Sequence, residues 1–600
     1  MRYLTKRCIF LFLALVLVGC SSAPRKPDII ARGDYSYTRE YITWLVQREM
    51  KKYNVTGLSI ALVDDQRVIW AEGFGFADKT GQVPATAETV YRVASLSKLF
   101  TATAAMQLAE QGKLDIDQPL KKYLPEFSIK SRFPDSSPIT LRTLMTHHSG
   151  LPADLQKGMW TKKPEPFMKV VHRVREEYAP FPPNFLYSYS NLAVTLLGCV
   201  LERISGRPFA SLLEKSLLQP LGMSQASFST GPDPSPLAAK AYSGDREVPD
   251  VSVRDLPAAG LNATVLDLSR FMEMVFAGGM AHERRVIGRE TLAEMLRPQN
   301  AAVPLDHDFR TGLGWVLSGM SHLAIKNAGP VAHHSGMTLY HRSFLIILPD
   351  HKLGVAVLAN SATAQGVVSR VAAAALKLAL EAKTGIKQPG RRDPPPSAGA
   401  LSPGALEGYA GLYATMAGVV PVTVKGDQLR AAIMGRELRL TPRADGLLKV
   451  GYKLLGLFPI SLGDFDFIGL GRATLAGRDI LKMRLDEQEV LIGERLKPLP
   501  IPHKWLERLG EYECVNAGDD TVLFKRLRLR QDRGFLIVDY EMPHFVKGTI
   551  SLALQPLSET EAIICGLSRG MGETICAVRT DGQEQLQYSG YLLRKKVSTP

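Results

Sequence analysis

Ser95 and Lys98 are separated by two residues within the apolar run YRVASLSKLF, residues 91–100, and Ser95 is the only serine followed three positions later by a lysine. On a helix, residues three positions apart are neighbours, so the lysine amine would lie beside the serine hydroxyl. Desolvation disfavours the charged form of a buried lysine, which can then act as a base. The pair therefore predicts a nucleophilic serine activated by a lysine. The alternative is a surface turn, with the serine near a helix cap and the lysine reaching water.

Two further polar groups follow in the chain. Tyr189 and Asn191 end a loop just before an apolar helical run. By themselves they are compatible with a tyrosine packed over a helix start and an asparagine cap. His334 and Gly336 precede two apolar strand-like runs. A glycine at that position would let a substrate approach the edge of a strand closely.

Other chemistry finds less support in the sequence. The string GLSRG, residues 566–570, fits the G-x-S-x-G nucleophile elbow, which requires a strand before the serine and a helix after it. Ser568 instead lies between two strand-like runs, so we predict a hairpin loop there. The chain has no HExxH motif, no paired CxxC motifs and no Walker phosphate loop. We therefore expect neither a metal site nor a cofactor.

The elements that position these residues predict an α+β fold. Residues 56–78 read as two strands around an Asp-Asp turn, and residues 95–111 as a helix that stops at Gly112. Residues 341–360 read as two more strands, with a helix beginning at Val367. Strands at both ends of this region and helices in the middle indicate one antiparallel sheet with a helical region inserted.

The C-terminal part has a different character. Residues 384–404 are rich in proline, glycine and charge and indicate a linker. Beyond them, residues 405–500 and 501–600 show short alternating runs, which predict two small antiparallel, lipocalin-like β-barrels. A weak repeat supports two units, because ALEGYAGLYATM and WLERLGEYECV lie one hundred residues apart. The alternating basic residues of 525–530 favour a solvated outer strand face over a binding groove.

The N-terminus reads as an export signal. A basic start and a short apolar run form residues 1–19, and the string before Cys20 resembles a bacterial lipobox, whose cysteine is acylated. Residues 20–34 would then be a tether, and residues 35–383 the first folded domain. The serine after Cys20 resembles an outer-membrane sorting signal. An ordinary secretory leader or an uncleaved anchor is the alternative.

The net charge of the chain indicates which kinds of partner it could bind. The formal charge of +14 favours anionic surfaces such as phospholipid, lipopolysaccharide or cell-wall polymer. No nucleic-acid-binding motif accompanies that charge, so we expect no nucleic acid partner.

Cys199 lies in an apolar helical run and is predicted to be an inert core residue. Cys565 and Cys576 lie in neighbouring strand-like runs, and their spacing leaves a disulfide open.

Taken in order, S-x-x-K, Y-x-N and H-x-G resemble the penicillin-recognising serine hydrolases. The chain is most similar to the class C β-lactamase-like family, which includes D-aminopeptidases, DD-carboxypeptidases and esterases. The resemblance covers roughly residues 40–380. It also extends to these strings: VYRVASLSKLFTATAAMQLAEQGKLDIDQPLKKYLP, ITLRTLMTHHSGLP, LLQPLGM and PAAGLNATVLDLSRFM. Certain D-aminopeptidases of the family also carry two C-terminal barrels.

The resemblance implies a role for each residue. Ser95 would be the acylated nucleophile, and Lys98 and Tyr189 would exchange the protons. Tyr189 would activate the deacylating water or assist the leaving group. Asn191 would orient Lys98 or hold the substrate amide. The backbone N–H groups of Ser95 and Met337 would form the oxyanion hole.

His334 departs from the pattern of many relatives, which have lysine there. A neutral imidazole anchors a substrate carboxylate more weakly than an ammonium, and histidine resembles the D-aminopeptidase and esterase branch. We expect activity on carboxylate substrates to rise as the pH falls through the usual histidine pKa. The other histidine pair, His147 and His148, matches a structural loop of the family and is not expected in the site.

These features predict a lipid-anchored serine hydrolase of the cell envelope that acts through an acyl-enzyme on D-amino-acid peptides, peptidoglycan fragments or small esters. It would lie at the outer membrane, facing the periplasm. A β-lactamase or DD-carboxypeptidase is an alternative, disfavoured by His334. A non-catalytic envelope-binding protein on the same scaffold is another, disfavoured by the retention of Ser95, Lys98 and Tyr189. The oligomeric state is left open.

Overall fold

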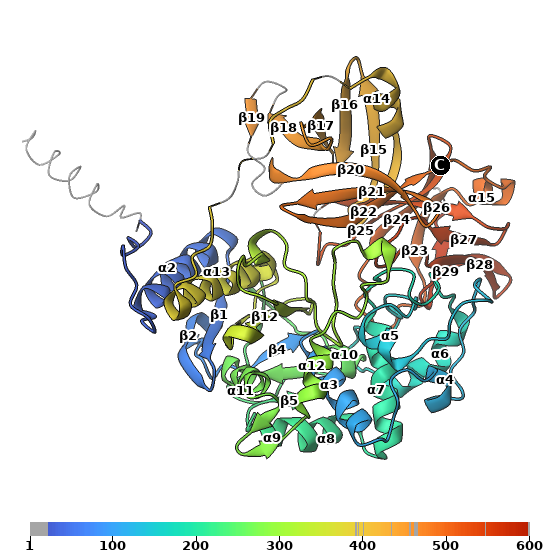
Figure 1. The fold of residues 1–600 in the computed structure, drawn as a ribbon. Helices are drawn as coiled ribbons and strands as arrows, with labels where there is room; N and C mark the ends of the chain where they lie inside the picture. Colours follow the sequence, from blue (N-terminus) through green and yellow to red (C-terminus); the bar gives the residue numbers. More distant parts are fainter. Residues whose placement is uncertain are drawn as a thin grey trace, which may run out of the picture.

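The computed structural model describes residues 22–390, 393, 395–399, 401–433, 435–454, 458–460, 466–546 and 548–597. Cys20 and the predicted leader lie outside these residues. In Figure 1 the two barrels stack against one side of the N-terminal domain, which runs from helix α2 to helix α13.

The main sheet of the N-terminal domain combines strands from both ends of that region, as the sequence predicts. Its order is β11-β12-β13-β1-β2-β3, and every neighbouring pair is antiparallel. The strands are β1 (Gly57–Asp64), β2 (Arg67–Asp78), β3 (Val83–Pro84), β11 (Ala332–Met337), β12 (Arg342–Leu348) and β13 (Leu353–Ala359). Strand β1 lies beside β13, which closes the domain around its two ends.

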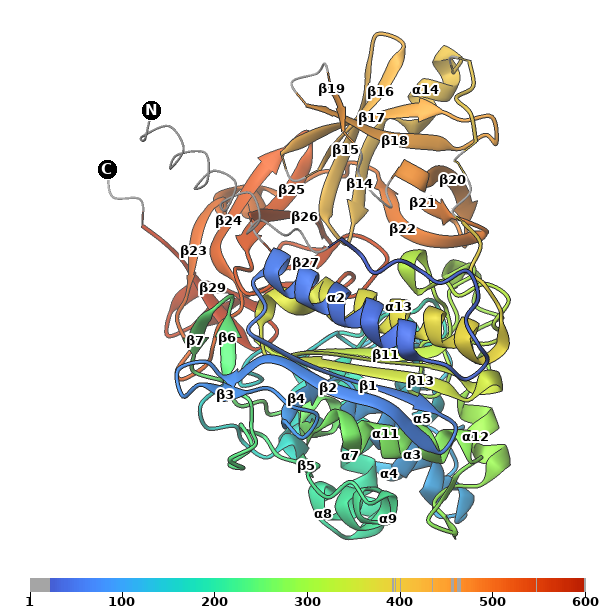
Figure 2. The same cartoon turned by 90° about the vertical axis from the view of Figure 1, so that its left-hand side faces the viewer.

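Helices cover both faces of this sheet (Figure 2). Helices α2 (Ser36–Tyr53) and α13 (Gln365–Thr384) lie on one face, and α3 (Ser97–Glu110) and α11 (Val265–Phe276) lie on the other. Strand β1 is therefore buried almost throughout: Ile60 and Leu62 join one apolar cluster, while Ala61 and Val63 join the other. A strand buried on both faces reads as a continuous apolar run.

The helical region packs against α3. Helix α7 (Asn191–Ser205) is its longest element, and a small sheet of order β4-β8-β5 runs alongside α3. The other elements are α4 (Leu120–Tyr123), α5 (Leu141–Met145), α6 (Val170–Arg173), α8 (Phe209–Leu213), α9 (Gln219–Leu221), α10 (Leu256–Ala259), α12 (Arg289–Met295), β4 (Tyr91–Ala94), β5 (Ser227–Phe228), β6 (Ala241–Ser243), β7 (Arg246–Val248), β8 (Leu261–Ala263), β9 (Met280–Ala281) and β10 (Arg284–Arg285).

The C-terminal region forms two closed eight-stranded antiparallel barrels, as predicted. The first closes through the β17–β18 pair and carries β19 as an added hairpin strand on β18. Its strands are β14 (Gly411–Thr415), β15 (Gly418–Lys425), β16 (Gln428–Ile433), β17 (Arg436–Pro442), β18 (Leu448–Leu454), β19 (Phe458–Ile460), β20 (Gly469–Leu475), β21 (Arg478–Leu485) and β22 (Gln488–Leu496). Closure of a sheet removes the unpaired edge strands that invite aggregation.

The second barrel closes through the β23–β30 pair. Its strands are β23 (Gly510–Cys514), β24 (Lys525–Asp532), β25 (Phe535–Glu541), β26 (Thr549–Pro556), β27 (Glu561–Ile564), β28 (Thr574–Thr580), β29 (Gln583–Tyr588) and β30 (Tyr591–Lys595). On β24 the basic residues alternate with Leu527 and the buried Leu529 and face mainly outward, as expected for a solvated strand face.

The sequence repeat has a structural counterpart at the start of each barrel. A short helix precedes the first strand: α14 (Pro403–Tyr409) in one barrel and α15 (His503–Glu507) in the other. The buried Tyr413 donates its hydroxyl hydrogen to the Tyr409 carbonyl at 2.9 Å, and the buried Tyr512 donates to the Arg508 carbonyl at 2.7 Å. The repeated tyrosine therefore ties each barrel's first strand to the helix before it.

The second barrel is held against the N-terminal domain by apolar and charged contacts. Phe181 and Leu186 share a buried cluster with the barrel side chains around Trp505. Arg132 and Tyr178 both bind the Glu561 carboxylate, at 2.9 and 2.7 Å. The barrel therefore has a defined position relative to the helical region.

The cysteines of the described residues are all free thiols. Cys199 is fully buried, as predicted for a core residue. Cys576 lies opposite Glu561 in the β27–β28 pair, whereas Cys565 follows the far end of β27, so the two thiols are separated along the ladder. Within the described part of the chain, no helix has both the length and the apolar character needed to span a membrane.

Candidate active site

Ser95 occupies the turn between strand β4 and helix α3. Ala94 has a positive φ of 51°, a conformation uncommon for a residue with a side chain, and the chain bends sharply there. Helix α3 begins at Ser97, two residues later than the sequence pattern predicts, because Ser95 and Leu96 complete the turn. Ser95 is half-buried and thus remains accessible, while Lys98 stands in the first helical turn.

Lys98 is 1% exposed, so the alternative of a lysine reaching water is wrong. Its Nζ atom lies 3.0 Å from Ser95 Oγ, 2.7 Å from Asn191 Oδ1 and 2.9 Å from the Ala258 carbonyl oxygen. Burial lowers the pKa of Lys98 well below its usual value, and the charge of Arg569 acts in the same direction. A neutral amine has two N–H bonds, which Asn191 and Ala258 accept, so its lone pair is directed to the Ser95 hydroxyl.

The Tyr189 side chain lies next to both Ser95 and Lys98. Lys98 Nζ lies 4.9 Å from the centroid of the Tyr189 ring. Burial raises the pKa of Tyr189 to about 12, while its hydrogen bond with the Ser95 side chain opposes that shift. Near neutral pH the phenol is therefore protonated, and Lys98 is the better proton acceptor of the two.

Asn191 is the first residue of α7, but it does not cap the helix. The cap is Ser190, whose hydroxyl accepts from the Ala193 N–H at 2.9 Å. The Asn191 side chain instead joins Lys98, through Oδ1, to Asp154 Oδ1, which accepts from Nδ2 at 2.6 Å. Its position is the one that the family resemblance implies for a residue that orients Lys98.

Strand β11 brings Gly336 against the nucleophile. A Cβ at Gly336 would lie 2.2 Å from the Val93 carbonyl oxygen and 3.2 Å from the Ser95 nitrogen. Only a glycine lets β11 lie this close to the end of β4. The backbone of Met337, the next residue, is thereby placed beside the turn that holds Ser95, while its side chain is exposed.

His334 is buried on the same strand and is neutral. Its pKa is lowered to about 3, first by burial and then by the nearby Lys98. Its Nδ1 lies 2.7 Å from the Ser335 carbonyl oxygen, which can only accept, so Nδ1 carries the hydrogen. The remaining ring nitrogen, Nε2, is therefore an acceptor. Burial moves the pKa of His334 far below mildly acidic pH, so the structure does not support a rise in carboxylate activity there.

His147 and His148, which the family resemblance assigns to a structural loop outside the site, lie beside it. His147 stacks on Tyr189, with 4.3 Å between ring centroids, and its Nδ1 accepts from the Ser190 N–H at 3.2 Å. His148 Nε2 lies 2.7 Å from an oxygen of the buried Asp306. Neither histidine is hydrogen-bonded to Ser95 in the part of the chain that the structure describes.

Two residues of the site, Asp154 and Arg569, have no signal in the sequence pattern; Arg569 directly follows the serine of the GLSRG string. Ser568 lies in the loop between the antiparallel strands β27 and β28, as predicted, and does not form a nucleophile elbow. The next residue, Arg569, reaches the site: its Nη2 donates to Asp154 Oδ2 at 2.8 Å, and its guanidinium carbon lies 5.1 Å from the Tyr189 ring centroid. Spacing rules cannot detect a contact between residues 415 positions apart.

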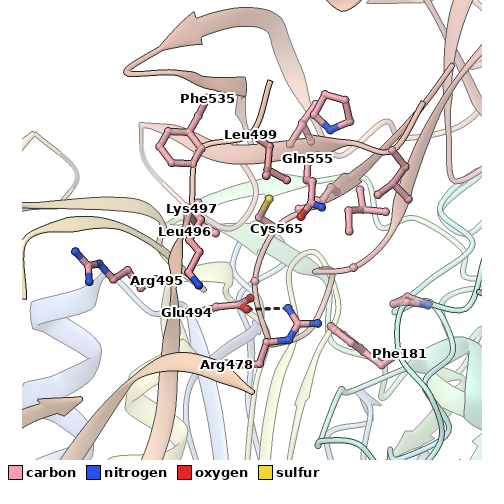
Figure 3. Close-up of a pocket in the computed structure, with 18 of the residues that line it drawn as sticks. Phe181, Arg478, Glu494, Arg495, Leu496, Lys497, Leu499, Phe535, Gln555 and Cys565 are labelled. Carbon is pink, nitrogen blue, oxygen red and sulfur yellow. Dashed lines mark hydrogen bonds and ion pairs between the residues drawn. The ribbon is translucent and has the colours of Figure 1, made fainter. Parts of the chain in front are cut away.

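A separate cavity of about 540 Å³ lies where the two barrels meet the N-terminal domain (Figure 3). Its walls are mostly apolar, with Phe181, Leu499 and Phe535 among them, and its lining includes the ion pair between Arg478 and Glu494, 2.7 Å apart. Ser95 is not part of its lining. No cluster of potential metal ligands occurs among the described residues.

Comparisons with known proteins agree with this geometry. A family model described as "Beta-lactamase" matches residues 42–380. Protein flp of Staphylococcus aureus (strain NCTC 8325 / PS 47) is 25% identical over 330 residues, which cover 54% of this chain and 63% of flp. The D-alanyl-D-alanine-carboxypeptidase/endopeptidase AmpH of Escherichia coli (strain K12) is 28% identical over 314 residues, which cover 50% of this chain and 78% of AmpH.

A solved structure extends the likeness beyond that region. The octameric penicillin-binding protein homologue from Pyrococcus abyssi is 23% identical, with a TM-score of 0.50, over 75% of this chain and 99% of that one. At this identity the likeness concerns the fold. The match to flp spans 63% of that relative's length.

Proposed function

The chain belongs to the beta-lactamase family of serine hydrolases, and on that premise we propose that it hydrolyses amide or ester bonds through an acyl-enzyme formed on Ser95. The observation that carries the proposal is the buried Lys98 amine, 3.0 Å from the Ser95 hydroxyl and bonded elsewhere to two acceptors. A pure scaffold has no physical need for an amine held in this way.

Acylation would begin when Ser95 Oγ bonds to the carbonyl carbon of the substrate and its proton passes to Lys98. The carbonyl electron pair moves onto the oxygen, which faces the N–H groups of Ser95 and Met337. When the carbonyl re-forms, the bond to the leaving group breaks, and that group takes a proton from Lys98 or Tyr189. Water would then attack the acyl carbon and give a proton to Lys98 or Tyr189. The bond between that carbon and Ser95 Oγ breaks, Oγ takes the proton, and the acid product leaves.

The substrate class we propose follows from His334. The hydrogen on His334 Nδ1 is donated to the Ser335 carbonyl oxygen. The other ring nitrogen, Nε2, can only accept a hydrogen bond, so it cannot bind a substrate carboxylate. Substrates with an N–H or ammonium group near the scissile bond therefore fit better than β-lactams. We propose D-amino-acid peptides, peptidoglycan fragments and small esters.

A DD-carboxypeptidase activity is the second candidate. It is favoured by the 28% identity to AmpH, a D-alanyl-D-alanine-carboxypeptidase/endopeptidase. The substrate of such an enzyme ends in a carboxylate, which His334 does not anchor. A D-Ala-D-Ala peptide, D-alanine anilide, a chromogenic cephalosporin and a nitrophenyl ester, assayed side by side, would separate the candidates.

We also propose that the protein is a lipoprotein of the cell envelope, acylated at Cys20 and facing the periplasm from the outer membrane. The lipobox-like string before Cys20 and the basic charge of the chain support this placement. Its partners would be small or peptide substrates, including peptidoglycan, and the membrane.

Covalent labelling tests the proposed function. A fluorophosphonate probe should label the wild type, and Ser95→Ala should abolish both labelling and turnover. Loss of a serine nucleophile costs up to about 10⁶ in kcat in well-studied hydrolases. Ser568→Ala, in the other serine motif, is the matched control and should retain both. Undiminished labelling of Ser95→Ala would refute the mechanism.

A further inference from the structure

The loop of residues 565–573, between β27 and β28 of the second barrel, packs against both the N-terminal domain and the first barrel. It returns on itself through the Gly572 N–H, which donates to the Ile564 carbonyl at 2.7 Å. A Cβ at Gly572 would lie 2.8 Å from the Pro180 carbonyl oxygen, and one at Gly566 would lie 3.1 Å from Ala414 Cβ in the first barrel. Gly566 and Gly572 also line the cavity of Figure 3. The loop is therefore seated closely against the N-terminal domain.

The last residue of the loop, Glu573, fixes it beside the active site. Glu573 Oε1 accepts from the Ala153 N–H at 2.8 Å, and Glu573 Oε2 accepts from the Tyr588 hydroxyl at 2.7 Å. Ala153 directly precedes Asp154, whose carbonyl accepts from the Ser589 hydroxyl at 3.0 Å. The second barrel is thus hydrogen-bonded to the backbone on both sides of the Asp154 side chain.

From this position Arg569 begins an unbroken series of polar contacts that ends at the nucleophile. Arg569 Nη2 donates to Asp154 Oδ2 at 2.8 Å, and Asn191 Nδ2 donates to Asp154 Oδ1 at 2.6 Å. Lys98 then donates to Asn191 Oδ1 at 2.7 Å and faces Ser95 at 3.0 Å. Each contact is as short as an ordinary or charge-assisted hydrogen bond.

The series has a definite direction because of the chemistry of its members. A carboxylate only accepts hydrogen bonds, so Asp154 forces the amide nitrogen of Asn191 toward itself. The amide oxygen then points to Lys98 and takes one of its hydrogens. Without a partner, the Asp154 carboxylate would be free to rotate and would leave an unbalanced negative charge near Lys98.

We propose that Arg569, supplied by the second barrel, is a positioning residue of the active site that acts through Asp154 and Asn191 to hold Lys98 in its proton-accepting state. This inference rests on the proposed function, since it concerns the same nucleophile and base. It also assigns the second barrel a part in the chemistry, in addition to any part in binding.

The electrostatics of the site agree with this role. Burial and then the Arg569 charge lower the pKa of Lys98, whereas the charges of Asp154 and Asp255 raise it. Removal of the guanidinium would therefore raise the Lys98 pKa, both directly and by exposing the full charge of Asp154. The base form of Lys98 would then be populated only at higher pH.

The test compares Arg569→Gln and Arg569→Lys with the wild type, using a neutral nitrophenyl ester from pH 5 to pH 10. We expect Arg569→Gln to lower kcat/KM at pH 7 about tenfold or more and to move the acid limb upward by at least half a pH unit. Arg569→Lys keeps a charge and should recover part of both. Arg579→Gln, at an exposed arginine of β28 in the same barrel, is the matched control and should match the wild type.

A second variant, Glu573→Gln, tests whether a loosened barrel causes the loss of activity. It weakens the hydrogen bond that holds the loop to Ala153 and leaves Arg569 in place. If undocking were the cause, this variant would show the same loss as Arg569→Gln, and neither acid limb would move. That result would overturn the inference.

A direct role in binding substrate would look different. Loss confined to substrates that carry a carboxylate, with the acid limb unmoved, would show that Arg569 binds substrate, and would also overturn the inference. A wild type that neither turns over ester nor accepts the probe at Ser95 would refute the proposed function and the inference together. An active wild type with an unchanged Arg569→Gln profile would refute the inference alone.

Discussion

Gly336 and Ser95 lie so close that a Cβ on the glycine would stand 3.2 Å from the serine nitrogen. The same atom would be 2.2 Å from the Val93 carbonyl oxygen, a distance that real Cβ atoms do not reach. Strand β11 can therefore approach the nucleophile only because residue 336 has no side chain. This contact fixes the distance between the two backbone N–H groups proposed for the oxyanion hole.

Gly336→Ala should consequently damage both stability and activity. Insertion of one methyl group into a closely packed site costs about 1–3 kcal/mol of the free energy of unfolding. Displacement of β11 should also lower kcat/KM at least about tenfold, because it moves Met337 away from Ser95. Urea unfolding and ester hydrolysis measure the two effects. The control is Gly404→Ala, in helix α14, where a Cβ meets nothing within 4 Å; equal behaviour of the two variants would contradict the prediction.

Lys98→Arg should inactivate the protein although it keeps a basic side chain. An arginine stays protonated across the accessible pH range, so it cannot take the Ser95 proton. General-base catalysis contributes about 10²–10⁴ in rate, and we expect a loss of that size. The pH profile of kcat/KM is the decisive measurement. The wild type should retain activity well below pH 10, because the lowered Lys98 pKa leaves the amine neutral there, whereas no pH should restore the variant.

His334→Lys should shift the preference of the enzyme toward carboxylate substrates. The ammonium would supply the charge that the neutral imidazole lacks, and a charge-assisted hydrogen bond is about twice as strong as a neutral one. We expect the ratio of β-lactam to ester kcat/KM to rise about tenfold. An unchanged ratio would mean that residue 334 does not face the substrate.

The wild-type substrate ratio should stay constant from pH 5.5 to pH 8.5. The pKa of His334 is about 3, so the imidazole remains neutral throughout that interval. Parallel pH profiles for the ester and the β-lactam would agree with this, since Lys98 affects both alike. A ratio that climbs as the pH approaches 5.5 would show that the imidazole gains a proton there.

Glu177, at the contact between the helical region and the second barrel, should make stability depend on pH. Burial, followed by the Glu573 charge, raises its pKa to about 7. A carboxyl group whose pKa is raised on folding binds its proton more tightly in the native state, so stability falls as the pH rises from about 4.5 to 7. Glu177→Gln should therefore stabilise the protein by about 1–2 kcal/mol at pH 8 and by little at pH 4.5. Equal effects at both pH values would contradict the prediction.

Cys20→Ser should release the protein from membranes into the soluble periplasmic fraction. Lipid chains hold a protein to a bilayer because each buried CH₂ group contributes about 0.8 kcal/mol. Fractionation of cells that express either form, followed by blotting, measures the distribution. Retention of the variant in the membrane fraction would instead indicate an uncleaved leader or attraction of the basic surface to anionic lipid.

The sequence by itself determined the features that depend on neighbouring residues. The three-residue spacing of Ser95 and Lys98 places both groups at one helix start, and the alternating runs after residue 405 predict barrels. The order of the three motifs was enough to indicate the family and to select Tyr189, Asn191 and Gly336. The Ser95–Lys98 spacing and the alternating runs are local, because helix and strand periodicity is encoded within a few residues. The roles of Tyr189, Asn191 and Gly336 came from the family resemblance.

Only the tertiary structure decided the electrostatic state of the site. Burial lowers the pKa of His334 to about 3 and the pKa of Lys98 well below its usual value, and no spacing in the sequence reveals that burial. The contact between Arg569 and Asp154 joins residues 415 positions apart, and the loop that carries Arg569 reads in the sequence as an ordinary hairpin. Such a contact depends on how the surface of a barrel fits the surface of another domain. Burial and charge at a site are sums over all the elements packed there, so they are set only when the whole chain has folded.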